Sequence, residues 1–330
     1  MNNGECKEPA LCAIDARRRF PDSSYRSLAR FLIARHPGMF KNFEHARATV
    51  RFTCGVKFNG KGNKVCKAGV PPNDPKKLMP CQRHINRSDY RLPTGTWGIL
   101  SDLHVPFHEI KPIESAMEWF KDNKITGIIL NGDAQDCEGV SYWHSTRRRD
   151  FVSEVEDMCD FLDMLRAAFP KVKIVFRRGN HEDRLEDYYR SNAPQLADLV
   201  TSDMSAILAL KKRKIEWLER KQKITINNFT LLHGHEMRGG YSPVSAARWA
   251  ILRAKACCAV GHFHATSECT ENDINKKMIT TWSIGCLCDL EPDYNPYGNK
   301  WNWGAAMLYN DGGDNWEFDN RRILMNGKLV

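Results

Sequence analysis

The sequence contains no long apolar run. No stretch reaches the length of about 18 apolar residues that a membrane-spanning helix needs, so we expect no membrane anchor. The first residues show no apolar segment behind a basic start, which argues against a secretory signal. Several of the 12 cysteines, such as Cys159, Cys257 and Cys258, lie within apolar stretches, where buried thiols are expected rather than disulfides. We therefore expect a cytoplasmic protein.

Acidic residues are scarce in one part of the chain only. The 330 residues carry a net charge of +9, with 42% hydrophobic and 27% charged residues, a globular composition that excludes wholesale disorder. Residues 1–91 contain 19 Lys and Arg against 7 Asp and Glu, whereas the remainder contains 30 against 33. This asymmetry indicates a basic module attached to a near-neutral body, with a polyanion as its partner.

The composition of the chain changes near residue 92. We expect a basic N-terminal domain with a linker over residues 1–91 and a larger domain over residues 92–330. The first contains two helical patterns separated by Pro37 and Gly38, which resemble a helix-turn-helix. The first helix is capped by Asp22, Ser23 or Ser24, and the second runs from about Asn42 to Gly55.

Basic side chains on or beside these two helices are candidates for contact with nucleic acid. They are Arg26, Arg30, Lys41, Arg47 and Arg51. A solvated basic extension that packs on the body would give the same pattern, so both interpretations stay open. Four more residues could hold zinc, but their spacing has no C-x2-C pair and favours scattered structural residues; they are Cys54, Cys66, Cys81 and His84.

From about residue 94 onward, strands and helices alternate. Apolar segments over residues 96–100, 124–130 and 171–176 predict strands, and residues 151–169 predict a long amphipathic helix. Residues 223–234 and 257–264 are predicted to contain further strands, and the tail alternates short strands with aromatic loops. An α/β pattern followed by a β-rich pattern predicts a layered sandwich.

The predicted strands of this body end in residues that bind metals. The segments are Ser101–His104, Asn131–Asp136, Gly179–Glu182, His233–His235 and Gly261–His264. Because the carboxyl ends of strands in an open α/β sheet line one crevice, we expect these side chains to converge. Carboxylate and imidazole donors without a thiolate suit manganese, iron or zinc, and there are enough donors for two ions. One such motif is common by chance, but five in order are not.

The ordered series D-x-H, G-D-x-x-D, G-N-H-E, H-G and G-H-x-H resembles the calcineurin-like metallophosphoesterase superfamily over about residues 96–285. The resemblance implies an α/β fold, a four-layer αββα sandwich of two mixed sheets, here preceded by the small basic helical domain. It also implies two divalent metal ions at the strand ends, with manganese expected and iron, zinc or nickel as alternatives. Asp102, His104 and His264 would bind the first ion, Asn180, His233 and His262 the second, and Asp133 both.

The resemblance also implies roles for three residues outside this ligand set. His181 would be the general acid that protonates the leaving group or stabilises the transition state, and Asp136 would orient it. Arg184 matches the arginine with which the protein-phosphatase branch of the superfamily grips phosphate. That branch has Asp-Arg-Gly at the end of its second block, whereas Cys137 and Glu138 follow Asp136 here. The missing arginine counts against a protein phosphatase.

We favour a phosphodiesterase that hydrolyses nucleic acid or nucleotides by in-line attack of a metal-bridging hydroxide, with His181 as general acid. Together with the basic module, the arrangement looks like phage or bacterial phosphoesterases of the DNA-exonuclease-like branch. One alternative is a phosphomonoesterase or protein phosphatase. Another is a DNA-binding protein whose metallophosphoesterase body serves as a scaffold. The sequence leaves the oligomeric state open.

Some residues near these motifs keep two interpretations. His108 and His235 either support the metal ligands or have a function of their own. Trp143, His144 and residues 147–149 either line the substrate path or form a solvated basic turn. An aromatic-rich loop could stack on bases, although packing is favoured; its aromatic residues are Tyr294, Tyr297, Trp301 and Trp303.

Overall fold

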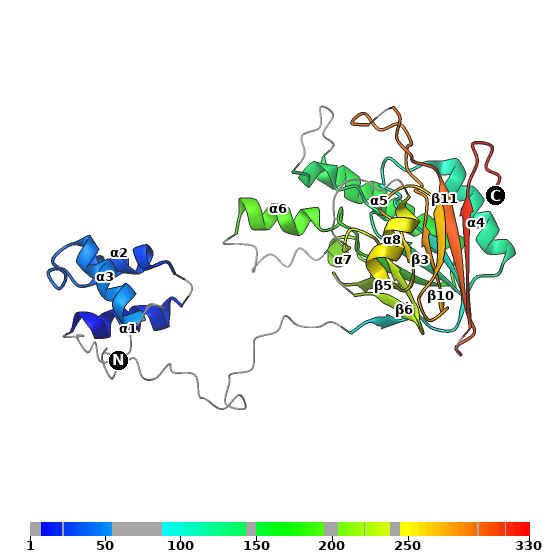
Figure 1. Cartoon of the computed structure of the whole chain (residues 1–330). Coiled ribbons are helices and arrows are strands. Elements are labelled where there is room, and N and C mark those ends of the chain that lie inside the picture. Colours follow the sequence, from blue (N-terminus) through cyan, green and yellow to red (C-terminus); the bar gives the residue numbers. More distant parts are fainter. Residues whose placement is uncertain are drawn as a thin grey trace. The chain divides into compact units, whose positions relative to one another are not determined.

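The chain forms two units, residues 1–84 and residues 85–330, each with its own hydrophobic core (Figure 1). The computed structural model describes residues 8–21, 23–54, 88–142, 150–194, 204–220, 222–237, 245–295, 297–313 and 315–330. Several residues considered above lie outside these ranges, as does the side chain of Cys54; they are Cys66, Cys81, His84, Trp143, His144 and residues 147–149. The zinc site and the basic turn therefore stay predictions.

The first unit contains three helices, α1 (Pro9–Arg19), α2 (Tyr25–Arg35) and α3 (Phe43–Cys54). Of the three predicted caps, Ser24 is the one that acts, because its hydroxyl accepts the Ser27 N–H at 3.1 Å. At the predicted start of the second helix, the Asn42 side chain accepts the His45 N–H at 2.8 Å. The predicted second helix thus corresponds to α3. The first helix, α1, was not predicted because its buried face consists of small residues; they are Cys12, Ala13 and Ala16.

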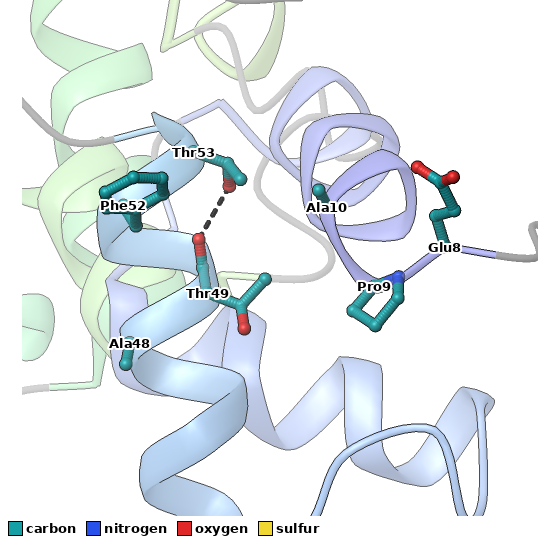
Figure 2. Close-up of a pocket in the computed structure, with 7 residues that line it drawn as sticks. All are labelled: Glu8, Pro9, Ala10, Ala48, Thr49, Phe52 and Thr53. Atoms are coloured by element: carbon teal, nitrogen blue, oxygen red, sulfur yellow. Dashed lines mark hydrogen bonds between the residues drawn. The ribbon is translucent and has the colours of Figure 1, made fainter. Parts of the chain in front are cut away.

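Helices α1 and α3 border a pocket of the first unit, which Figure 2 shows. Its lining residues are Glu8, Pro9, Ala10, Ala48, Thr49, Phe52 and Thr53. The Thr53 hydroxyl donates a hydrogen bond to the Thr49 carbonyl oxygen at 2.7 Å, so this polar side chain is satisfied within the last turn of α3. Since Glu8 is the one ionisable side chain among these lining residues, the pocket offers no set of groups for catalysis.

The second unit contains two mixed sheets of six strands each. The first sheet has the order β12-β11-β2-β3-β4-β5, and its four strands from β2 to β5 run parallel. The bounds are β2 (Gly95–Leu100), β3 (Gly127–Asn131), β4 (Lys173–Arg177), β5 (Ile215–Leu218), β11 (Gly304–Asn310) and β12 (Trp316–Arg322). The carboxyl ends of the four parallel strands therefore lie along one edge.

The second sheet has the order β1-β6-β7-β8-β10-β9. Its strands are β1 (Tyr90–Arg91), β6 (Ile224–Ile226), β7 (Phe229–Leu232), β8 (Cys257–Val260), β9 (Ser267–Asn272) and β10 (Met278–Ser283). Because β1 pairs in parallel with β6, the sheet begins before residue 92. Strands β7 and β8 also run parallel, which brings their carboxyl ends to one edge as well.

The two sheets face each other, and helices cover their outer faces (Figure 1). Trp97 and Ile129 of the first sheet meet Phe229 and Trp282 of the second in one core. Helices α4 (Ile110–Asp122) and α5 (Phe151–Ala168) pack on the other face of the first sheet, and α8 (Ala246–Ala254) packs on the second sheet. This order of layers confirms the four-layer αββα fold. The structure also contains α6 (Arg184–Asn192), α7 (Met204–Ile207) and the 3₁₀ helix η3 (Glu138–Val140).

Successive apolar side chains of a strand in the first sheet pack on opposite faces of that sheet. Ile129 of β3 points into the core between the sheets, while its neighbours Ile128 and Leu130 pack against α4 and α5. All three side chains are 0% exposed, and burying each one contributes about 1.5–3 kcal/mol. The strand is therefore apolar up to Leu130, and the first polar side chain is that of Asn131, its last residue.

Three features of the body differ from the predictions. Residues 223–234 form a hairpin of β6 and β7 rather than one strand, because Asn227 adopts a left-handed conformation (φ 46°) that turns the chain. Strand β9 was missed because its sequence, SECTEN, is a polar sheet edge. Helix α8 was missed because it has only nine residues. Among the described residues, no helix is long and apolar enough to cross a membrane.

Glu154 of α5 is a carboxyl group inside the fold. Its side chain is 0% exposed, and it accepts the Gly139 N–H at 3.0 Å, while its second oxygen has no hydrogen-bond partner. Burial, reinforced by the nearby Asp136 and Glu138, raises the pKa of Glu154 to about 7. Because this value exceeds the ordinary 4.5, the folded state binds the proton more tightly than the unfolded chain, and stability is lost as the pH rises from 4.5 through 7.

Replacing Glu154 with Gln should therefore raise the free energy of unfolding at pH 8 by roughly 1–3 kcal/mol and change it little at pH 5. Glutamine keeps the acceptor for Gly139 and removes the buried charge. Urea unfolding followed by tryptophan fluorescence measures this second unit, because all 9 tryptophans follow residue 92. Glu156→Gln, at an exposed position of the same helix, is the matched control. A gain of equal size at both pH values would contradict the assignment.

Candidate metal centre

Strand ends from both sheets meet at one place, as the sequence predicts. Strands β2, β3 and β4 of the first sheet and β7 and β8 of the second each lead into polar residues that contact one another. We call these residues the strand-end cluster; it consists of Asp102, His104, Asp133, Asp136, Asn180, His181, His233, His262 and His264. Side-chain contacts bring eight of these nine predicted residues together, and Asn180 stands in the sequence next to His181, with its side-chain oxygen buried.

The first group of converging donors contains Asp102, His104 and His264. The Nε2 atoms of the two histidines lie 3.2 Å apart, and His264 Nε2 lies 3.2 Å from Asp102 Oδ1. Both oxygens of Asp102 also accept the His262 N–H at 3.0 Å, which fixes the carboxylate. Two imidazole nitrogens that face each other beside a carboxylate form a site suited to a divalent cation.

The second group contains Asp133, His233 and His262, whose potential ligand atoms lie within 4.8 Å of one another. His233 Nε2 lies 3.0 Å from Asp133 Oδ2 but makes no hydrogen bond of acceptable geometry there. The Asn180 side-chain oxygen is likewise buried without a partner. Buried polar atoms are rarely left unpaired, so these two atoms are what a metal site offers before a cation is bound.

The outer nitrogens of three histidines determine how their rings are presented. His233 Nδ1 lies 2.8 Å from the Asn131 carbonyl oxygen, and His104 Nδ1 lies 2.7 Å from Asp136 Oδ1. His264 Nδ1 lies 4.0 Å from the sulfur of Cys288. In each case the outer contact holds Nδ1 and turns Nε2 toward the cluster, as metal-ligating imidazoles require. The residues therefore fit divalent metal ions.

Glu182 holds the backbone of two cluster loops through hydrogen bonds. Its carboxylate accepts the backbone N–H groups of Asp133, Ala134 and Gln135 at 2.8–3.1 Å and that of Gly179 at 2.7 Å. The side chain is 1% exposed, so the four donors find their partner inside the protein. Glu182 belongs to the G-N-H-E motif, but the motif alone predicts no role for it.

Backbone conformation is unusual at this site. Five cluster residues have left-handed φ angles between 49° and 65°; they are Asp102, His104, Asp133, His262 and His264. Such angles are uncommon outside glycine and accumulate at functional sites. Two glycines beside these residues have different reasons to be glycine. Gly132 has a left-handed φ of 87°, whereas a side chain at Gly179 would collide with Asp133.

His181 lies beside the cluster in a position suited to proton transfer. Its Nδ1 lies 2.8 Å from the Asp136 carbonyl oxygen and 3.0 Å from Oδ1, and its Nε2 lies 3.0 Å from a guanidinium nitrogen of Arg184. Burial opposes the charged ring, but the Asp133 and Asp136 carboxylates outweigh it and raise the pKa of His181. Asp136 also holds His104, so one carboxylate serves a predicted metal ligand and the predicted acid.

Carboxylates and imidazoles of the strand-end cluster shift one another's pKa values. Burial alone would raise the pKa of Asp102, but the charge and hydrogen bond of His264 lower it to about 2. Burial also opposes a charged His233, yet Asp133 raises its pKa to about 10. Burial and the charge of His233 lower the pKa of His262 to about 4.

Other residues considered in the sequence take supporting places. His235 lies beside His233, with ring centroids 5.3 Å apart, and burial lowers the pKa of His235 to about 4. His108 packs on Phe161, with ring centroids 5.9 Å apart, and belongs to no metal-binding group among the described residues. Cys288 was missed, although its place in the C-x-C sequence after β10 puts it beside His264.

Comparison with known proteins agrees with this geometry. Residues 96–268 match the family model for calcineurin-like phosphoesterases. The chain belongs to this family. The calcineurin-like phosphoesterases are metal-dependent, and the strand-end cluster contains the donors that divalent ions need. The resemblance drawn from the motifs is therefore confirmed, while the assignment of single ligands to two ions stays a prediction.

This calcineurin-like phosphoesterase is 24% identical over 229 residues to the Gene 54 protein of Mycobacterium phage L5, a match that covers 65% of this chain and 88% of that protein. Among solved structures, Vacuolar Protein Sorting 29 from Cryptosporidium parvum aligns at a TM-score of 0.37 with 13% identity, covering 72% of this chain and 96% of that one. YfcE, a phosphoesterase from E. coli, aligns at 0.36 with 15% identity, covering 71% and 96%. At these scores the structural likeness adds nothing to the family match.

Two single substitutions should separate metal binding from proton transfer. Asp133→Ala should lose both bound metal and phosphoesterase activity, since Asp133 lies among the converging donors. His181→Ala should keep its metal and lose turnover by about 10²–10⁴-fold. Metal content after gel filtration and turnover of an aryl phosphoester measure the two effects, with His36→Ala in the first unit as control. Equal metal loss in both variants would make His181 a ligand instead of an acid.

Proposed function

We propose that this protein is a divalent-metal-dependent phosphodiesterase that cleaves phosphodiester bonds in nucleic acid or nucleotides. The observation that carries the proposal is the position of His181, which lies between Asp136 and Arg184 at the edge of the strand-end cluster. Phosphodiester hydrolysis needs an activated water molecule and a proton for the leaving oxygen, which a two-metal centre and an adjacent histidine would provide.

The donors named above would hold two metal ions, with manganese favoured, and these would activate a water molecule and neutralise charge on the phosphate. Asp136 fixes His181 through Nδ1, so that Nε2 is the atom that carries the transferred proton. As the bond between phosphorus and the leaving oxygen breaks, His181 protonates that oxygen. Arg184, now bonded to His181 and Asp136, would turn its guanidinium to a non-bridging phosphate oxygen.

The charge of the phosphate group favours a diester over a monoester. A monoester carries nearly two negative charges near pH 7, whereas a diester carries one. Arg184 supplies one guanidinium to the cluster, and Cys137 occupies the position of the second arginine of the protein-phosphatase branch. Cys137 is 0% exposed and so offers no group to a substrate. These features support a singly charged phosphate as the substrate.

The helices of the first unit support a nucleic-acid substrate. Arg26 and Arg30 lie one turn apart on α2, and Arg51 lies on α3, all with exposed side chains. Arg47 instead pairs with Glu44 at 3.1 Å, which makes it the weakest of the predicted contacts. Arginine side chains that are free to reach phosphates are what backbone contact with a polyanion requires.

The reaction class is tested with matched aryl esters. In Mn²⁺, bis-p-nitrophenyl phosphate should be hydrolysed with a kcat/KM at least roughly tenfold above that of p-nitrophenyl phosphate, a difference of about 1.4 kcal/mol. His181→Ala serves as the control that this turnover belongs to the cluster. A preference for the monoester would favour the phosphomonoesterase alternative. Hydrolysis of neither ester in any divalent metal, with DNA binding that survives EDTA, would favour the scaffold.

The role of the basic helices is tested in the full chain. Replacing Arg26, Arg30 and Arg51 together by Gln should weaken DNA binding at low salt, and the slope of log affinity against log salt should fall by about one for each phosphate that the protein no longer neutralises. Fluorescence anisotropy with a labelled oligonucleotide measures this across salt concentrations. Three exposed lysines of the body, changed to Gln, form the matched control: Lys111, Lys171 and Lys328. Unchanged affinity would favour a basic extension without a nucleic-acid partner.

A further inference from the structure

An aromatic series leads from the cluster to the solvent. Trp301 packs on the metal-ligand candidate His264, with ring centroids 4.2 Å apart and ring planes at 60°. Tyr294 follows, with its ring centroid 6.1 Å from that of Trp301 and the planes at 65°. Both residues lie in the connection from β10 to β11, drawn in orange in Figure 1. This connection therefore forms a wall beside the site of chemistry.

The outer members of this wall stay exposed. Tyr294 is 77% exposed and Trp301 is half-buried, whereas Trp97 and Trp282 in the core between the sheets are 2% and 8% exposed. Burying a large aromatic side chain would contribute about 1.5–3 kcal/mol, and the fold forgoes much of this at Tyr294. Exposed aromatic rings beside a catalytic site are a surface for a flat ligand.

Hydrogen bonds hold this wall in place. The Asn299 side chain donates to the carbonyl oxygens of Leu290 and Asn295 at 2.7 Å and 3.0 Å, and its oxygen accepts the Trp301 N–H at 3.1 Å. The Asn302 N–H donates to the His264 carbonyl oxygen at 2.8 Å. The rings are therefore placed relative to the cluster before any ligand arrives, which lowers the entropy cost of binding.

Ring contacts connect this wall to the cluster in two steps. Trp301 packs on His264, and Tyr294 packs on Trp301. A ligand whose phosphate lies in the strand-end cluster would therefore reach Trp301 and then Tyr294 with the group next to that phosphate.

We propose that Tyr294 and Trp301 form a stacking subsite for a nucleobase attached to the phosphodiester that is cleaved. This inference rests on the proposed phosphodiesterase function and specifies its substrate. The phosphate occupies the strand-end cluster and Arg184, and the base stacks on the exposed aromatic faces. Stacking accepts any base, because every base has a π-face, so the subsite selects nucleotides over alkyl phosphodiesters without reading a sequence.

Two substrates with the same leaving group isolate the base: thymidine 5′-(p-nitrophenyl) phosphate and methyl p-nitrophenyl phosphate, both assayed in Mn²⁺. Tyr294→Leu and Trp301→Leu should raise KM for the nucleoside ester by about 5- to 150-fold, the range expected when one base no longer stacks. For the exposed Tyr294, the substitution to Leu should change neither kcat nor the KM of the methyl ester by more than about twofold, within the range of surface substitutions. Tyr294→Phe and Trp301→Phe should restore the low KM, since phenylalanine still stacks.

A binding measurement tests the subsite apart from turnover. Thymidine 5′-monophosphate should quench tryptophan fluorescence in the metal-loaded wild type, and ribose 5-phosphate should not. In Trp301→Phe the quench should disappear while the affinity for the nucleotide is retained. Quenching of equal size by both phosphates would overturn the stacking assignment. Because this measurement needs no hydrolysis, failure of the diester assay would refute the phosphodiesterase and leave the subsite still under test.

Tyr294 distinguishes a stacking role of Trp301 from a purely structural one, because Tyr294 contacts Trp301 but belongs to the same proposed subsite. If Trp301 only orients His264, Trp301→Leu raises KM for both esters and lowers metal content. Tyr294→Leu then changes nothing, because the Tyr294 ring packs on Trp301 and not on a ligand candidate. That result would overturn the proposal.

A single-stranded oligonucleotide and the nucleoside ester distinguish the two sources of the base. A lower KM for the oligonucleotide identifies nucleic acid as the substrate, and a lower KM for the ester identifies nucleotides; either preference, if abolished by Tyr294→Leu, supports the stacking subsite.

Discussion

One buried carboxylate holds the catalytic end of the body together. Glu182 accepts four backbone N–H groups from the ends of β3 and β4, and each of these donors would cost about 1–3 kcal/mol if it were buried without a partner. The same contacts place Asp133 next to His181, whose N–H then donates to Asp133 Oδ1 at 2.9 Å. The geometry of the cluster therefore depends on a residue that itself touches no substrate.

A second carboxylate links the two kinds of chemistry. Asp136 contacts His104, a candidate metal ligand, and His181, the candidate acid, through the same Oδ1 atom. Burial would raise the pKa of Asp136, but the hydrogen bonds of the two histidines lower it, so the group stays ionised. Two rings thus share one negative charge. A change in the charge of either ring alters the electrostatic field at the other, so the proposed metal ligand and the proposed acid would influence each other.

The sequence predicts much of the cluster because each ligand follows an apolar strand. Leu100 and Leu232 are the last residues of their strands, and Leu130 is the last apolar residue of β3. Because parallel strands finish at one edge of a sheet, the residues that follow are expected to converge. The sequence did not predict the roles of residues whose partners are set by tertiary contacts. The role of Glu182 depends on N–H groups 47–49 residues earlier in the chain, and Cys288 meets His264 only after β10 has paired with β8. Helix α1 was also not predicted, because the residues of its buried face are small and give only a weak apolar pattern in the sequence.

The left-handed backbone of five ligand candidates has a consequence for the whole fold. Asp102, His104, Asp133, His262 and His264 each hold a conformation that costs on the order of 1–3 kcal/mol. Hydrogen bonds to Glu182 and Asp102 and the packing of the two sheets must offset that cost. A substitution that weakens a distant core should therefore let these loops relax before the sandwich unfolds. We therefore expect metal affinity to respond to changes in sheet packing that leave the fold itself intact.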